Sequence, residues 1–169
     1  MKTMAVIALL MIVFASYALA ALKINDDAPQ FSLRDSAGNK YTLNDLVGPT
    51  KKESNNGVVL SFFASWCTPC RNELPLMNAL ADELKGKGIH VVLVDVKEDF
   101  ATIKNLLAEL KVDKPIVLSD RNGKTSEEYQ IRFLPMTFFI GSDAKIKTII
   151  FGEIKERAVL KANAWKLLR

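Results

Sequence analysis

The chain has 169 residues, of which 49% are hydrophobic and 25% are charged, a balance that supports one folded domain and excludes a disordered chain. Its formal net charge at pH 7 is +4, but the lysines are scattered, with no basic stripe interleaved with aromatic residues. Nucleic acid is therefore not expected as a partner.

Residues 1–20 form a segment of their own. Lys2 precedes an apolar run from Met4 to Phe14, and the segment closes on the small-residue sequence 18–20. This three-part pattern predicts a signal peptide over residues 1–20 and a domain over residues 21–169. The apolar stretch also reaches the lower length limit of a membrane-spanning helix, so an uncleaved anchor stays open. Either way we expect the domain to be secreted across the cytoplasmic membrane, and to be periplasmic or anchored facing outside.

The first predicted elements are strands. Alternating polar and apolar residues at 30–33 and 40–43, on either side of the turn formers 35–39, predict a hairpin. Residues 48–57 are polar and rich in turn formers, which predicts a surface loop. The apolar run 58–63 is typical of a strand buried on both faces.

Helices and strands alternate after that strand. Leu74, Met77, Leu80 and Leu84 recur at helical spacing, and later helices are expected at about 101–110, 126–129 and 155–168. Further strands are expected at 90–96, 116–118, 137–140 and 147–151. Alternation implies parallel strands covered on both faces, and the late strand–turn–strand unit adds an antiparallel part, so the predicted class is α/β with a mixed sheet.

Cys67 and Cys70, directly after the strand at 58–63, are the only cysteines of the chain. A structural disulfide between residues this close would close a very small loop and add little stability. A structural zinc site usually needs four ligands, and the chain adds a single histidine, His90. A two-thiolate site for Cu(I) fits the ligand count and stays an alternative.

The position of the cysteine pair favours redox catalysis. A Cys-x-x-Cys turn between a strand and a helix places the first sulfur near free N–H groups and the positive end of the helix dipole, which lowers a thiol pKa. We therefore expect Cys67 to attack and Cys70 to resolve. A thiol peroxidase would need a P-x-x-x-T-x-x-C setting, which residues 64–66 do not supply. A non-catalytic scaffold is the third possibility, and it predicts no consequence when both cysteines are lost.

The sequence SFFASWCTPCRNELP at 61–75 resembles thioredoxin-fold proteins, and more narrowly the secreted TlpA/ResA/DsbE group of thiol-disulfide oxidoreductases. The resemblance extends to residues 28–33, with Asp35 and Gly38, and to residues 133–138. It implies a thioredoxin-like fold in which helices flank a mixed central sheet, with an N-terminal β-hairpin extension.

Two prolines match positions of that family. Pro135 matches a cis-proline packed beside the cysteines, which implies that the backbone of Leu134 pairs with an extended substrate segment. A trans proline at the start of an edge strand is the alternative. Met136 stands where the family usually has threonine. Pro75 matches the proline that kinks the active-site helix.

Acidic and aromatic residues near the cysteines also match. Glu73 corresponds to a glutamate implicated near the disulfide, and the alternative is an ordinary first-turn acid favoured by the helix dipole. Ser61 stands where many thioredoxins carry a buried aspartate, and Glu98 is a weaker match to a second acidic residue. Trp66 is expected to shield the reactive sulfur and offer contact area to a partner, with a core tryptophan as the alternative.

The resemblance implies reduction of protein disulfides outside the cytoplasm, for example in apocytochrome c during cytochrome c maturation. A membrane thiol donor of CcdA/DsbD type would resupply electrons. That the protein reduces disulfides and does not form them is inferred from the resemblance, since residue types alone do not set a reduction potential. We expect a monomer with no cofactor and no resident metal. The alternative function is a soft-metal protein that binds Cu(I) through the same thiols.

Overall fold

The structure is a computed structural model that describes residues 21–47 and 55–168. The expected signal segment at residues 1–20 lies outside the described residues, as does most of the predicted loop at 48–57. No helix in the described part of the chain is long and apolar enough to cross a membrane.

A mixed sheet forms the centre of the molecule. Within the described residues it has seven strands in the order β2-β1-β5-β4-β3-β6-β7. The pairs β3–β4 and β4–β5 are parallel and the other neighbours are antiparallel, which confirms the predicted mixed sheet. The strands are β1 (Ser32–Arg34), β2 (Lys40–Thr42), β3 (Gly57–Phe63), β4 (Ile89–Val96), β5 (Ile116–Asp120), β6 (Met136–Gly141) and β7 (Ile146–Phe151).

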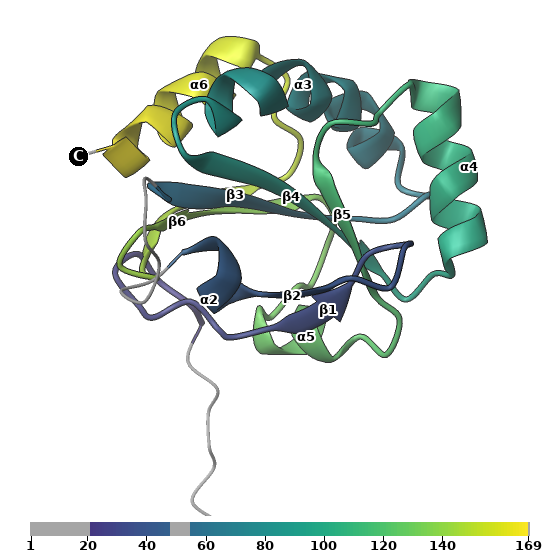
Figure 1. The fold of residues 1–169 in the computed structure, drawn as a ribbon, viewed down its shortest axis with the longest axis horizontal. Coiled ribbons are helices and arrows are strands. Elements are labelled where there is room, and N and C mark those ends of the chain that lie inside the picture. The colour runs from purple at the N-terminus through teal and green to yellow at the C-terminus, as the bar shows by residue number, and fades with distance from the viewer. Residues whose placement is uncertain (1–20, 48–54, 169) are drawn as a thin grey trace, which may run out of the picture.

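Helices cover both faces of the sheet (Figure 1). They are α2 (Leu43–Leu46), α3 (Thr68–Lys85), α4 (Phe100–Leu110), α5 (Lys124–Glu128) and α6 (Arg157–Trp165), which a short 3₁₀ helix, η1 (Lys166–Leu168), extends. α3 and α6 lie on one side of the sheet, whereas α2 and α5 lie on the other. The sequence patterns did not predict α2, a single turn whose start is closed by a reciprocal capping box between Thr42 and Asp45.

The central strand β3 is buried along its whole length, as its apolar run predicts. Val59 and Phe63 belong to the core cluster that includes α3, and Val58, Leu60 and Phe62 belong to the cluster on the opposite face. Alternate residues of a strand point to opposite faces, so a strand with helices on both sides must be apolar on both. The carboxyl end of β3 therefore lies inside the sheet, between the end of β4 and the start of β6.

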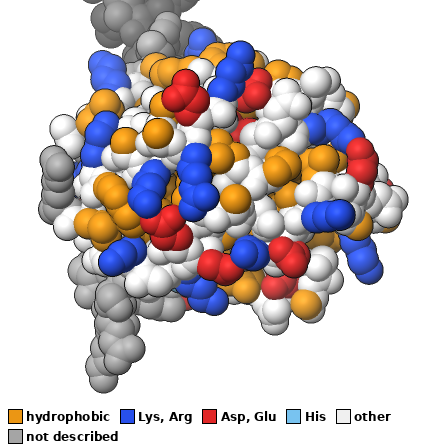
Figure 2. Space-filling view, turned by 90° about the horizontal axis from the view of Figure 1, so that it is seen from above, with side chains coloured by type: hydrophobic (Ala, Val, Ile, Leu, Met, Phe, Trp, Pro, Cys, Tyr) orange, Lys and Arg blue, Asp and Glu red, His pale blue; other side chains and the backbone are white. Residues whose placement is uncertain are grey.

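The outer face of α3 and α6 carries basic and acidic side chains interspersed with apolar ones (Figure 2). Part of this charge is paired between the two helices, since Glu83 of α3 forms ion pairs with Arg157 and Lys161 of α6. Exposed pairs of this kind contribute little stability, so the apolar contacts beneath them hold the two helices in place.

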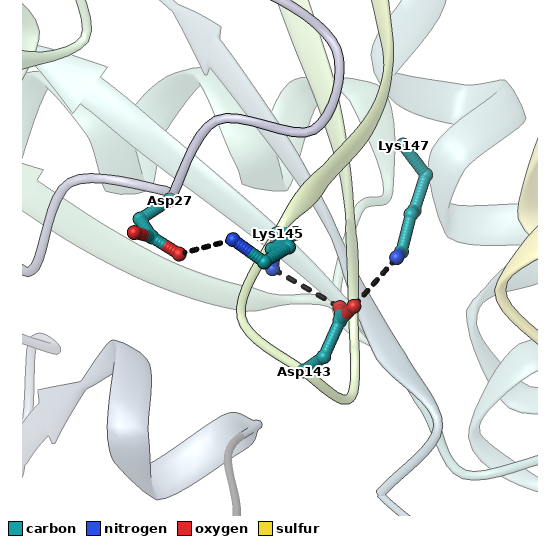
Figure 3. Close-up of polar contacts among 4 residues, drawn as sticks. All are labelled: Asp27, Asp143, Lys145 and Lys147. Atoms are coloured by element: carbon teal, nitrogen blue, oxygen red, sulfur yellow. Dashed lines mark hydrogen bonds and ion pairs between the residues drawn. The ribbon is translucent and has the colours of Figure 1, made fainter.

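The N-terminal segment runs beside the edge strand β7. Asn25 N–H donates to the carbonyl of Ile146, whose own N–H donates to the carbonyl of Asp26. Lys145 Nζ lies 2.8 Å from Asp27 Oδ1, and Lys147 Nζ lies 2.7 Å from Asp143 Oδ2 in the adjoining turn (Figure 3). The segment thus covers the beginning of an edge that would otherwise offer free backbone groups.

Candidate active site

The two cysteines lie where β3 ends and α3 begins. Cys67 is the N-cap residue of α3 and forms a disulfide with Cys70. The N–H of Cys70 points at Cys67 Sγ at 3.2 Å. Cys67 is 5% exposed and Cys70 is 1% exposed, so the first sulfur is the more accessible of two largely covered atoms. The helix N-terminus directs unpaired N–H groups at Cys67, which favours a thiolate there once the disulfide is reduced.

A cis peptide bond joins Leu134 to Pro135, as the resemblance implies for this position. The ladder between β3 and β6 ends at the pair Phe62 and Met136, so the cis bond lies next to the end of the strand that leads to the cysteines. The carbonyl of Pro135 accepts the N–H of Gly152 at 2.9 Å, which ties this turn to the end of β7. Met136 is buried in β6.

Trp66 is 72% exposed, so the core-tryptophan alternative is wrong. Two further aromatic side chains, Phe133 and Phe151, are also largely exposed, and their rings contact each other with centroids 5.9 Å apart. Phe133 directly precedes Leu134. Exposed aromatic residues are enriched at protein–protein interfaces, so the rings of Phe133 and Phe151 offer a contact surface next to Leu134 in the sequence.

Glu73 lies one helical turn beyond Cys70 and is buried, with 2% of its surface exposed. The N–H of Ile154 donates to Oε2 at 2.7 Å, and the hydroxyls of Ser61 and Thr137 lie 3.2 Å and 3.3 Å from Oε1. Glu73 therefore points into the protein between β3, β6 and the segment after β7, and the alternative of an ordinary first-turn acid is wrong.

Burial raises the pKa of Glu73 to about 7, although hydrogen bonds from Ile154, Ser61 and Thr137 act in the opposite direction. The carboxyl thus changes charge near neutral pH, where a proton acceptor or donor is most useful. Ser61 is part of this arrangement, because its hydroxyl joins Glu73 to Thr137 across the sheet.

Two further acidic residues, Glu98 and Asp95, hold the turn that precedes Cys67. The carboxylate of Glu98 accepts hydrogen bonds from both the N–H and the hydroxyl of Ser65. The N–H of Glu98 donates to Oδ1 of Asp95 at 3.1 Å. Glu98 is only a weak match by sequence, and Asp95 was not predicted as a site residue. The available signal was an aspartate near the end of an otherwise apolar strand.

Asp95 is fully buried, and burial raises its pKa to about 8. Glu98 raises this pKa further, because its carboxylate accepts a hydrogen bond from the protonated Asp95 and repels the ionised form. Asp120, at the end of β5, adds to the repulsion. Asp120 itself receives the N–H groups of Thr125 and Ser126 at the start of α5.

Pro75 and His90, two other residues singled out in the sequence, lie away from the contacts of Glu73 and Glu98. Pro75 lies inside α3 on its exposed side, and the helix continues past it to Lys85, so the kink itself stays a prediction. His90 lies half-buried on β4, with Nε2 3.0 Å from Asn55 Oδ1. Among residues 21–47 and 55–168, no group of three or more His, Cys, Asp or Glu could hold a metal ion.

A Cys-x-x-Cys turn at the start of a helix, packed on a mixed sheet beside a cis-proline, defines a thioredoxin-like thiol-disulfide oxidoreductase. The model of the AhpC/TSA family matches residues 24–149, and the chain belongs to this family.

Relatives of known function agree with that class. The chain is 33% identical over 132 residues to the thiol-disulfide oxidoreductase ResA of Bacillus cereus (strain ZK / E33L), an alignment that covers 78% of this chain and 72% of the relative. Its identity to ResA of Bacillus subtilis (strain 168) is 32% over 133 residues, covering 79% and 70%.

Solved structures extend the similarity to the fold. A Chlorobium tepidum protein described as a DsbE thiol:disulfide interchange protein superposes with a TM-score of 0.77 and 28% identity, covering 88% of this chain and all of the other. StoA from Bacillus subtilis shares the fold alone, with a TM-score of 0.65, 20% identity and coverage of 80% and 96%. The thioredoxin-like fold is confirmed, and the chain is a thiol-disulfide oxidoreductase of ResA/DsbE type.

Proposed function

We propose that this protein reduces the disulfides of other proteins outside the cytoplasm, with Cys67 and Cys70 as its redox pair. The observation that carries the proposal is the placement of Cys67 as the N-cap of α3, more accessible than Cys70. In the reduced protein the Cys67 thiolate attacks one sulfur of the substrate disulfide. A mixed disulfide forms, and the other substrate sulfur leaves and takes up a proton.

Cys70 completes the reaction. Its thiol loses a proton and attacks Cys67, which forms the Cys67–Cys70 disulfide and releases the second substrate sulfur as a thiol. Glu73 is the proposed proton acceptor for Cys70, because both side chains are buried one turn apart on α3 and burial raises the pKa of Glu73 to about 7. The structure contains the oxidised product of this cycle.

The proposed substrate-binding residues are Trp66, Leu134 and Pro135. Trp66 offers exposed aromatic surface next to Cys67, and the backbone of Leu134 lies beyond the end of the β6 ladder, where an extended segment of a partner could pair with it. The cis bond at Pro135 orients that backbone. Pro75 bends α3 in this proposal, and thereby adjusts the position of its first turns.

The proposed location and partners are based on the same group of proteins. The signal-like pattern of residues 1–20 supports secretion across the cytoplasmic membrane, with a periplasmic or membrane-anchored domain that faces outside. A relative of known structure, 27% identical, is described as an exposed lipoprotein thioredoxin of Streptococcus pneumoniae. We propose protein disulfides such as that of apocytochrome c as substrates, a membrane thiol donor of CcdA/DsbD type as the electron source, and a monomeric state.

Trapping tests the proposal. A Cys70→Ser variant expressed with its own N-terminal segment should accumulate mixed disulfides through Cys67, because the resolving sulfur is gone, and a Cys67→Ser/Cys70→Ser variant is the matched control. Non-reducing gels and mass spectrometry would identify the captured proteins. The proposal fails if no partner is captured while Cys67 stays free and reactive. Stoichiometric Cu(I) uptake that persists against a competing thiol would instead support the metal-binding alternative.

A further inference from the structure

Asp95 is a buried carboxyl with no role in the reaction proposed for Cys67, Cys70 and Glu73. It lies next to the last residue of β4, with none of its surface exposed. As a carboxylate it leaves Oδ2 without a hydrogen-bond donor, the single such buried side-chain atom in the described part of the chain. A buried polar atom without a hydrogen bond destabilises the folded state, so an unsatisfied atom such as this one needs a physical explanation.

The side chain of Asp95 holds the turn that follows β4. Oδ1 accepts the N–H of Glu98, and the intervening Lys97 has a φ of 65°, in the left-handed region that residues other than glycine seldom occupy. The N–H of Lys97 donates to the carbonyl of Asp120 on β5. These hydrogen bonds hold residues 96–98 in one backbone conformation. That conformation brings the side chain of Glu98 back over the end of the sheet.

Glu98 transmits this arrangement to the reactive turn. Its carboxylate receives the N–H and the hydroxyl of Ser65, two residues before Cys67. The N–H of Cys67 in turn donates to the carbonyl of Ala64 at 3.2 Å. A continuous set of contacts thus runs from the end of β4 to the backbone that presents the accessible sulfur.

The charges around Asp95 oppose its ionisation. Glu98 faces it from the following turn and Asp120 from β5. Its register partner on β3 is the apolar Phe63, and the side chain of Lys97 lies against Gly123 instead. A proton on Asp95 removes the repulsion, supplies the donor that Glu98 can accept, and leaves Oδ1 free to hold the N–H of Glu98.

We infer that Asp95, as a neutral carboxylic acid, is a positioning residue that acts through Glu98 and Ser65 to fix the turn from which Cys67 attacks. The inference rests on the proposed role of Cys67 and adds to it a residue that never touches the substrate. Ionisation of Asp95 would place a second negative charge beside Glu98, loosen the turn and disfavour the neighbouring thiolate.

Two substitutions separate positioning from charge. Asp95→Asn keeps an acceptor for Glu98 N–H and a donor for its carboxylate, whereas Asp95→Val keeps the shape of the buried side chain and removes both. We expect Asp95→Val to slow the reaction of reduced Cys67 with a small aromatic disulfide about tenfold at neutral pH, and Asp95→Asn to stay within about twofold of wild type. Asp99→Asn, at the exposed neighbouring aspartate that caps α4, is the matched control and should leave the rate unchanged.

The pH profile gives a readout that a merely structural role would not move. Between about pH 6 and pH 9 the wild-type rate should fall increasingly below that of Asp95→Asn as Asp95 loses its proton. Glu98→Gln should slow the reaction in the wild-type background and have little further effect in Asp95→Val, because the two residues act as one unit.

The outcomes are distinct. A folded Asp95→Val that reacts like wild type overturns the inference, and so does an Asp95→Asn variant that is as slow as Asp95→Val. If Asp95→Val does not fold, the Asp95→Asn profile decides: a rate that matches wild type near pH 6 and exceeds it increasingly toward pH 9 supports the inference, and a profile parallel to that of wild type overturns it. Failure of wild type and Asp99→Asn alike to react would instead contradict the proposed function.

Discussion

Glu73 and Asp95 are both buried carboxyls near the disulfide, but their surroundings differ. Glu73 has hydrogen-bond partners on both oxygens, two hydroxyls and one backbone N–H. Asp95 receives one N–H and faces two other carboxyls. Burial raises the pKa of both, to about 7 for Glu73 and about 8 for Asp95. The two carboxyls thus differ in what surrounds them: hydrogen-bond donors lower the pKa of Glu73 against the effect of burial, whereas Glu98 and Asp120 add to the effect of burial at Asp95. This difference suits the roles that we propose, an exchangeable proton acceptor for Glu73 and a retained proton for Asp95.

The largest expected effect comes from removing Glu73, the proposed proton acceptor. Glu73→Gln should slow resolution of the mixed disulfide at neutral pH by about 10²-fold, the lower end of what general-base catalysis contributes. The measurement is single-turnover release of the thiol from a mixed disulfide preformed on Cys67. Glu83→Gln, at a half-buried glutamate on the same helix that pairs with α6, is the control. Equal release rates in Glu73→Gln and wild type would remove the distinction between the two carboxyls.

The pH dependence of folding stability tests both carboxyls at once. Each pKa is higher in the folded state, so each group's contribution is fully retained below the unfolded pKa and declines as the pH rises to the folded one. The window runs from 4.5 to about 7 for Glu73 and from 3.8 to about 8 for Asp95. Between these limits each should lower the free energy of unfolding by about 1.4 kcal/mol per pH unit.

Urea denaturation at several pH values measures this slope. Glu73→Gln and Asp95→Asn should each flatten it, the first only up to about pH 7 and the second up to about pH 8. A slope unchanged by Asp95→Asn would mean that Asp95 is ionised in the folded protein. Asp95 could then not be the neutral counterpart of Glu73.

A smaller effect is expected from the hydroxyls around Glu73. Ser61→Ala removes a hydrogen bond that lowers the pKa of Glu73, so the pH midpoint of the resolution step should move upward by less than one unit, equivalent to about 1 kcal/mol. The kinetic pH profile measures the midpoint. Ser126→Ala removes a buried hydroxyl that donates to Asp120, away from Glu73, and should leave the midpoint in place. A downward shift in Ser61→Ala would show that the hydroxyl stabilises the protonated acid instead.

The smallest effect is expected at the surface carboxylates, which provide the contrast to the buried pair. Asp27→Asn breaks the ion pair with Lys145 shown in Figure 3, and should lower the free energy of unfolding only slightly, because the pair is exposed. The loss should shrink further at high salt, because exposed charges are screened. Thermal unfolding at two salt concentrations measures it, and a larger, salt-independent loss would show that the N-terminal segment depends on this pair.

Much of the fold was predictable because its signals are local. The apolar run at 58–63 identified β3, and the spacing of Leu74, Met77, Leu80 and Leu84 identified α3. The last helix was expected from 155 and begins at Arg157, within the usual fraying of helix ends. α2 was missed because a single turn has too few residues to show a period, although its Thr42 and Asp45 carry a capping pattern.

By itself the sequence determined the order of the elements, the mixed α/β class and the cysteine pair at the start of a helix, because periodicity and motif spacing are properties of neighbouring residues. The tertiary structure alone decided which carboxyls are buried and what surrounds them. The N–H that binds Glu73 comes from Ile154, 81 positions away, and the Ser65 that Glu98 holds is 33 positions away. A pKa depends on desolvation and on charges nearby in space, and only the packing of β3, β4, β6 and α3 brings those groups together.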